Sequence, residues 1–91
     1  MAVKILIPTP LRRLTDNRQD VMYDGATVNE VVRNLENEFP ALRNKLFDQG
    51  GKIKKFIKVY VNGKDINELG GGETPVADGD EVSLIPAAFG G

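Results

Sequence analysis

One amphipathic segment constrains the fold more than any other part of this 91-residue sequence. Thr27 is followed three positions later by Glu30, which is the pattern of a capping box at the start of a helix. Apolar residues then recur at the spacing of a single helical stripe, at Val28, Val31, Val32, Leu35 and Phe39. Pro40 ends this helix. A helix that is apolar along one stripe needs a second layer against it, so the sequence predicts a sheet that covers the stripe.

Alternating apolar and polar residues, which are typical of strands, fill most of the remaining chain. The alternation and the turn residues predict strands over residues 2–8, 19–23, 52–62, 64–69 and 81–86. Asn62-Gly63 is a strong hairpin signal, and Asp78-Gly79-Asp80 favours another turn. Residues 41–47 are expected to form a short further turn, and residues 70–74 a flexible loop.

The order of these elements predicts an α+β fold. Two strands, the helix, a strand, a short strand and a last strand suit a mixed four- to five-stranded sheet packed on one main helix. This is the ubiquitin-like β-grasp arrangement. We expect residues 1–86 to form this domain and residues 87–91 to form a flexible tail that ends in Gly90-Gly91.

The composition excludes several classes of function. The sequence has no cysteine and no histidine, so it lacks a disulfide framework, a thiol nucleophile and the most common general base. Twelve basic residues balance thirteen acidic ones, and this balance favours neither a nucleic acid nor an anionic membrane as a partner. No apolar stretch approaches the ~20 residues of a membrane-spanning helix, and no signal peptide is evident. We therefore expect a cytoplasmic protein without catalytic or metal-binding residues of its own.

Three polar clusters have ordinary structural interpretations. The carboxylates of Asp78, Asp80 and Glu81 fit a turn better than a cation site, because no metal-ligand spacing accompanies them. The glycines of residues 70–72 fit a loop, because no lysine and serine or threonine follow them as in a phosphate-binding loop. A basic cluster predicts a solvated face or a patch for an acidic protein partner; it comprises Arg43, Lys45, Lys52, Lys54, Lys55 and Lys58.

A set of apolar side chains is predicted on the sheet face that points away from the helix. They are Leu6, Phe56, Tyr60 and Ile85, with Met22 as a possible fifth member. Scattered single apolar residues on a surface need no explanation, whereas a contiguous exposed patch marks a protein-binding site. The number on one small sheet face favours the binding site.

The sequence ends in Gly90-Gly91, and this ending points to chemistry at a main-chain carboxylate. Glycine has no Cβ, so the pair can pass through a narrow channel and present its carboxylate without steric shielding. The stretch from Pro86 to Gly91 spans about 20 Å when extended. An adenylating partner would convert the carboxylate to an acyl-adenylate, which a sulfur or amine nucleophile could attack. The alternative is an inert frayed tail.

Taken together, the residues resemble the ThiS/MoaD family of ubiquitin-like sulfur carriers. The resemblance covers essentially the whole chain and rests on the hairpin at residues 59–63, the turn at residues 78–82, and the tail from Pro86 to the final glycines. The stretches at residues 7–12 and 85–88 are most similar to the CysO-type carriers of cysteine biosynthesis.

The resemblance implies a function in which the chain is a carrier and not an enzyme. A ubiquitin-activator-like adenylyltransferase and sulfurtransferase would use ATP and Mg²⁺ to activate Gly91, so the chain itself would need no cofactor. Gly90 would give access to the sulfur on Gly91, while Phe89 and the apolar sheet face would bind partners. A cysteine synthase is the expected partner in sulfur donation. The alternatives are the small subunit of molybdopterin synthase bound to its large subunit, a modifier joined to lysine, and a β-grasp interaction module with an inert tail.

Overall fold

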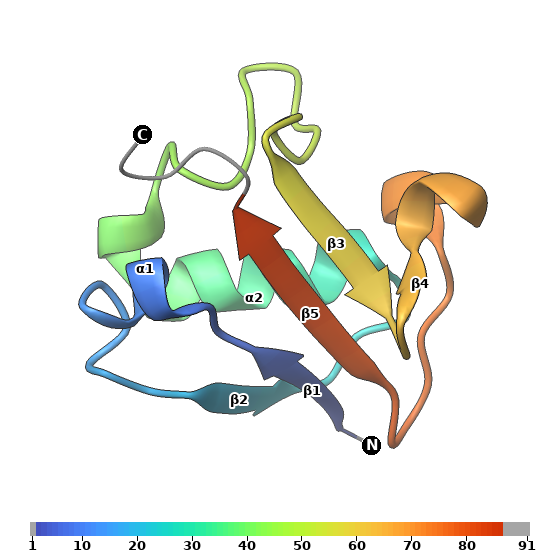
Figure 1. Cartoon of the computed structure of the whole chain (residues 1–91), viewed down its shortest axis with the longest axis horizontal. Coiled ribbons are helices and arrows are strands. Elements are labelled where there is room, and N and C mark those ends of the chain that lie inside the picture. The colour runs from blue at the N-terminus through green and yellow to red at the C-terminus, as the bar shows by residue number, and fades with distance from the viewer. Residues whose placement is uncertain (1, 87–91) are drawn as a thin grey trace.

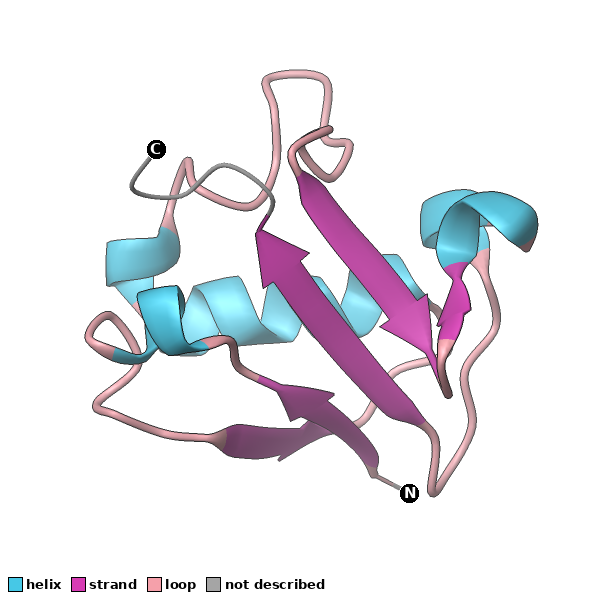
Figure 2. Cartoon of the chain, in the orientation of Figure 1, coloured by secondary structure: helices cyan, strands magenta, loops and turns pink. Residues whose placement is uncertain are grey.

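The structure is a computed structural model, and it describes residues 2–86. A mixed sheet lies against one main helix (Figures 1 and 2). The elements are β1 (Val3–Leu6), α1 (Thr9–Arg12), β2 (Asp20–Tyr23), α2 (Val28–Glu38), β3 (Ile57–Val61), β4 (Lys64–Asp65) and β5 (Glu81–Pro86), with short 3-10 helices at Pro40–Leu42, Ile66–Glu68 and Gly71–Glu73. The five strands lie in the order β2-β1-β5-β3-β4, in which only β1 and β5 are parallel neighbours. The predicted α+β, β-grasp arrangement is confirmed.

The capping box forms at the start of α2. The side-chain oxygen of Thr27 accepts a hydrogen bond from the backbone N–H of Glu30 at 3.3 Å. The Glu30 carboxylate accepts one from the backbone N–H of Ala26 at 3.0 Å, one residue earlier than in the standard box. The helix ends before Phe39 and Pro40, as expected, and the further turn predicted over residues 41–47 is a 3-10 helix at Pro40–Leu42. The Thr27 bond satisfies one of the N–H groups that a helix start leaves without an intrahelical partner, and the Glu30 bond ties the residue before the cap to the helix.

The core lies between α2 and the inner face of the sheet. Inward-facing residues sit beside one another across the strands: Ile5 is opposite both Val21 and Val82, and Val82 is opposite Val61. All four are buried, as are the α2 stripe residues. Leu11 of α1 is fully buried and closes one end of the core. Burying each such side chain stabilises the fold by about 1.5–3 kcal/mol before entropy is counted.

Three predicted segments differ in the structure. The strand predicted over residues 52–62 spans only Ile57–Val61, because the preceding residues form a loop that is held by a bridge between Phe47 and Ile53. The strand predicted over residues 64–69 ends at Asp65, whose side chain caps a 3-10 helix by accepting from the N–H of Asn67 at 2.8 Å. Part of the predicted loop at residues 70–74 is a 3-10 helix.

The Asn62-Gly63 hairpin forms as predicted. Both residues have positive φ angles, 51° for Asn62 and 87° for Gly63. Positive φ at both central positions defines the type I′ turn, whose twist matches that of the flanking strands. The turn fixes the register in which Val61 pairs with Lys64 and Tyr60 pairs with Asp65.

We expect the substitution Gly25→Ala to destabilise the fold by about 1–3 kcal/mol, the usual cost of overpacking. A Cβ at this position would lie 2.7 Å from Cγ1 of Val31 and 3.3 Å from its backbone nitrogen. Val31 is fully buried in α2, so it has little room to move. Urea unfolding followed by circular dichroism measures the change. Gly50→Ala is the matched control, because its Cβ would make only an ordinary contact with Asp48; equal stability of the two variants would contradict this account.

Candidate docking face of the sheet

The outer face of the sheet brings three of the predicted apolar residues together. Leu6 on β1 is the register partner of Ser83 on β5, and Ser83 is also the partner of Tyr60 on β3. Ile85 lies two residues farther along β5 on the same face and is 50% exposed. Leu6 and Tyr60 are half-buried, because neighbouring side chains cover part of each. We call these four residues, Leu6, Tyr60, Ser83 and Ile85, the docking face.

Met22 lies on the same side of the sheet but outside the docking face. It is the register partner of Lys4, which is itself the partner of Glu81. The row of Lys4 and Glu81 lies two residues along the strands from the row that contains Leu6 and Ser83. Met22 is 52% exposed, and none of the docking-face residues is its register partner.

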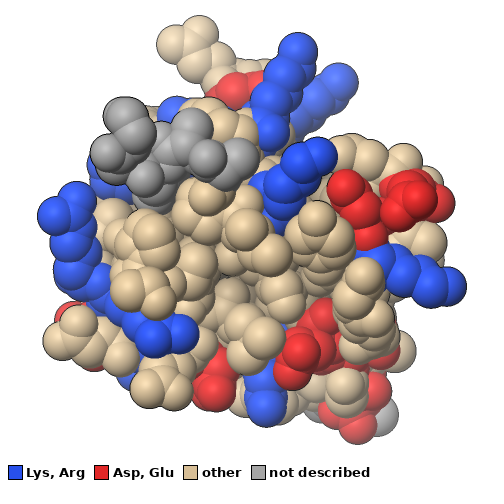
Figure 3. Space-filling view, in the orientation of Figure 1, with Lys and Arg blue, Asp and Glu red and all other residues tan. Residues whose placement is uncertain are grey.

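Charged side chains surround the docking face. Figure 3 shows uncharged residues across the middle of this view, with Lys and Arg gathered along its upper and left borders. Lys58 on β3 lies 3.8 Å from the carboxylate of Asp65 on β4. Such an exposed ion pair contributes little to stability. An apolar centre inside a polar rim is the usual anatomy of a protein–protein interface.

Phe56 lies at the end of the sheet and not within a strand. It belongs to the turn that precedes β3, closed by a hydrogen bond from the N–H of Ile57 to the carbonyl of Lys54. The prediction that Phe56 alternates within the same strand as Tyr60 is wrong, because β3 begins one residue later. Phe56 is 37% exposed and lines a groove beside α1. Pro10 and Leu14 line the same groove.

The predicted tail residues Phe89, Gly90 and Gly91 lie outside the described residues. What the structure describes is the point from which they continue. β5 runs as far as Pro86, which is the register partner of Ile57. Ile85 of the docking face immediately precedes it, so the described chain ends at the border of that face.

Two carboxylates of the turn at residues 78–81, those of Asp78 and Asp80, have structural roles. Asp80 accepts hydrogen bonds from the Asn62 side chain at 3.0 Å and from the Ala77 N–H at 2.8 Å. Asp78 accepts from the N–H of Ala2 at 2.8 Å. Within residues 2–86, no group of three or more acidic, histidine or cysteine residues is placed to hold a metal ion. The turn interpretation thus has direct support from these contacts.

The pKa of Asp80 lies below its usual range, first because Asn62 donates to the carboxylate and second because the Ala77 N–H does. A lowered pKa in the folded state means that the carboxylate form stabilises the fold at neutral pH. This contribution is lost as the pH falls through the ordinary aspartate pKa of about 3.9 and then the lower folded value. We expect Asp80→Asn to flatten this part of the stability profile between about pH 5 and pH 2, as measured by urea unfolding. Identical profiles for the two proteins would contradict the expectation.

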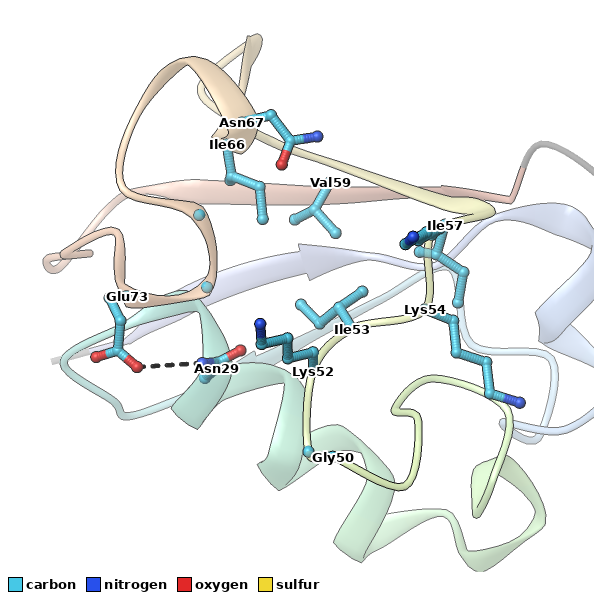
Figure 4. Close-up of a pocket in the computed structure, with 14 residues that line it drawn as sticks. Asn29, Gly50, Lys52, Ile53, Lys54, Ile57, Val59, Ile66, Asn67 and Glu73 are labelled. Atoms are coloured by element: carbon cyan, nitrogen blue, oxygen red, sulfur yellow. Dashed lines mark hydrogen bonds between the residues drawn. The ribbon is translucent and has the colours of Figure 1, made fainter.

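A pocket of about 610 Å³ lies on the helix side of the sheet (Figure 4). Ile53, Val59 and Ile66 provide its apolar lining, while Asn29 donates a hydrogen bond to Glu73 at 3.4 Å at one side. Its lining includes Lys52, Lys54 and Lys55 of the predicted basic cluster but no residue of the docking face. It is therefore a separate feature from the docking face.

In the described part of the chain, residues 2–86, no helix has the length and apolar character that crossing a membrane requires.

Comparison with known proteins identifies the family. The family model described as "ThiS family" matches residues 5–91, which is nearly the entire sequence. The chain belongs to the ThiS family. Sulfur carrier protein CysO of Mycobacterium tuberculosis is 38% identical over 93 aligned positions that cover all of both chains. The resemblance inferred from the sequence is thereby confirmed.

Two further relatives of this ThiS-family chain inform its function. A chain in the crystal structure of the BexX/CysO complex from Amycolatopsis orientalis superimposes with a TM-score of 0.88 and 39% identity, over 99% of this chain and 100% of that one. Small archaeal modifier protein 3 of Haloferax volcanii is 40% identical over 68 residues, which are 75% of this chain and 73% of that protein. The first supports the β-grasp fold, and the second shows that proteins named as modifiers are also similar to this chain.

Sequence reasoning did not identify Ser83 as part of the docking face of this ThiS-family protein. Ser83 is small and polar, so no hydrophobic pattern marks it. It lies between Leu6 and Tyr60 only because β5 pairs with β1 on one side and with β3 on the other. The one sequence signal for Ser83 was its place between the inward-facing Val82 and Leu84, which predicts that its side chain points outward.

Proposed function

We propose that this protein is a sulfur carrier whose C-terminal glycine carboxylate becomes a thiocarboxylate that donates sulfur, in cysteine biosynthesis. The observation that carries the proposal is the full-length identity of 38% with Sulfur carrier protein CysO. The family match extends through residue 91, so it includes the two glycines on which the chemistry depends.

The proposed reaction takes place in two steps at Gly91. First, a carboxylate oxygen attacks the α-phosphorus of ATP, and pyrophosphate leaves. Second, sulfide (HS⁻) attacks the acyl carbon; the C–S bond forms as the bond from that carbon to the AMP oxygen breaks, AMP leaves, and loss of the sulfur-bound proton gives the thiocarboxylate. ATP and Mg²⁺ are bound by the partner enzyme in this scheme, so the chain acts as a substrate and not as a catalyst. We expect it to work in the cytoplasm, where ATP is available.

The docking face is proposed to hold the chain on its partners while the tail reaches their active sites. The three apolar side chains lie at the border where the described chain ends, so a partner that covers them lies beside the start of the tail. A CysO protein has been crystallised in complex with BexX, which supports the proposal that this chain also works by binding a partner protein. We propose a ubiquitin-activator-like adenylyltransferase and a cysteine synthase as the partners, with Phe89 contributing to the contact.

Exchange between ATP and pyrophosphate tests the first step. The purified activating enzyme from the same organism is expected to exchange labelled pyrophosphate into ATP only when this chain is present. The enzyme alone provides the control for background exchange. Exchange that is independent of the chain, or absent in its presence, would contradict the proposed adenylation.

A protein modifier is the second candidate, favoured by the 40% identity to Small archaeal modifier protein 3. In that role the activated Gly91 carbonyl would be attacked by a lysine amine and form an isopeptide bond. Cells that express the chain with an N-terminal tag would then contain tagged conjugates of higher mass that survive denaturation. Their absence, together with a thiocarboxylate on the free chain, would leave the carrier role as the function.

A further inference from the structure

Three of the twelve basic residues of this nearly neutral chain line one groove that has no acidic residue in its lining. The groove has a volume of about 380 Å³ and is lined by Pro10, Arg13, Leu14, Asn44, Lys45, Lys54 and Phe56. Three of these residues are cations, and no carboxylate is among them. The whole chain has a net charge of only −1, so this arrangement is a local excess that overall composition conceals.

The groove lies at the end of the sheet where β5 ends. Phe56 directly precedes Ile57, the residue that pairs with Pro86. The acidic turn at residues 78–81 lies at the opposite end of β5, and six strand residues span roughly 20 Å. A partner that receives the residues beyond Pro86 therefore meets the cationic end of the sheet and not the acidic one.

The groove combines apolar walls with one cation that is held by a hydrogen bond, Lys54, and two that are exposed, Arg13 and Lys45. The Lys54 Nζ donates a hydrogen bond to the carbonyl of Asn44 at 2.6 Å and lies 5.8 Å from the centre of the Phe56 ring. Its ammonium is thus positioned in the groove. Arg13 and Lys45 are exposed, and their long side chains can adjust to a ligand. Leu14 packs against the core and gives the groove an apolar surface.

We propose that this groove binds an acidic segment of the partner protein, one that carries Asp or Glu beside an apolar side chain. The proposal rests on the proposed function for the partner's identity, since a partner that binds the tail reaches the groove. Charge complementarity favours an anion, and the apolar walls favour a peptide over a phosphate backbone. Rim charges of this kind mainly accelerate association and make it sensitive to salt.

The first test uses peptides and needs no activating enzyme, so its result is independent of the carrier reaction. ¹⁵N-labelled protein is titrated with the acetylated, amidated peptide Glu-Glu-Leu-Glu-Glu, and chemical shifts are followed by NMR. We expect saturable shifts concentrated at the amides of Arg13, Lys45, Lys54 and Phe56, which disappear in high salt. The matched peptide with glutamine in place of every glutamate is expected to cause no such shifts. Equal shifts with both peptides, or none with either, would overturn the proposal, as would tighter binding of an oligothymidylate at the same amides.

Charge reversal provides the second test. The double variant Arg13→Glu/Lys45→Glu is expected to bind the acidic peptide at least about tenfold more weakly, because two exposed cations are replaced by carboxylates that repel the glutamates of the peptide. Lys64→Glu is the control, since this exposed lysine lies on β4 at the hairpin end of the sheet, away from the groove; it should change the affinity less than about twofold. The NMR spectra of the variants also report whether they fold, and Arg13→Gln/Lys45→Gln provides a milder pair. Equal affinity of the reversal and control variants would overturn the proposal.

Discussion

Deleting Gly91 is expected to reduce chain-dependent exchange of pyrophosphate into ATP by at least about 100-fold, because a reacting carboxylate displaced by one residue no longer reaches the attack position. The deletion leaves a terminal carboxylate on Gly90, so charge and chemical type are preserved and only its position changes. Stability is expected to remain unchanged, because the hydrogen-bonded sheet is complete at Pro86.

An extended chain serves as the counterpart of this deletion. One alanine added after Gly91 moves the carboxylate outward by one residue and adds a Cβ to a terminal residue. We expect a comparable loss, whereas Ala87→Ser, which leaves the last two glycines in place, should retain most of the exchange. Full exchange by both the shortened and the extended chains would show that the reaction does not depend on the carboxylate of Gly91.

Tyr60→Asp is expected to weaken binding of the activating enzyme by about 10- to 100-fold, which corresponds to about 1.4–2.8 kcal/mol. Tyr60 is half-buried beside Ser83 in the docking face, and aromatic residues at the centre of an interface often dominate its binding energy. A carboxylate at this position would have to lose its hydration on binding. Isothermal titration calorimetry or surface plasmon resonance measures the effect.

Met22→Asp is the matched control for the docking face. It introduces the same side chain at an exposed apolar position on the same side of the sheet, in the row that Met22 forms with Lys4 and Glu81. We expect less than about a threefold change in affinity, since substitutions outside an interface centre are nearly neutral. Thermal unfolding verifies that both variants are folded. An equal loss in the two variants would place the partner elsewhere or show that it covers the whole face.

Local patterns were sufficient to predict the elements that depend on neighbouring residues. The spacing of Thr27 and Glu30 predicted the helix cap, and Asn62-Gly63 predicted the hairpin, because both depend on hydrogen bonds or φ angles within a few residues. The alternation of β5 placed Leu84 in the core and Ile85 outside. These features led to the β-grasp arrangement without knowledge of long-range contacts.

Long-range contacts determined what the sequence did not reveal. The segment before β3 alternates like a strand, yet it forms a loop in which Ile53 bridges to Phe47, and Arg33 of α2 lies 3.7 Å from the centre of the Phe47 ring. Phe56 consequently lines a groove beside α1. The separation of Met22 from the docking face depends on strand register, which alternation within a single strand does not specify.

The central claim is that Gly91 carries sulfur, and the intact mass of the chain tests it most directly. After incubation with the activating enzyme, ATP and a sulfur source, the mass is expected to increase by about 16 Da, as one carboxylate oxygen is replaced by sulfur. The increase should require ATP, and it should be absent from the chain that lacks Gly91. An unchanged mass of the full chain, under conditions in which the enzyme exchanges pyrophosphate in its presence, would contradict the claim.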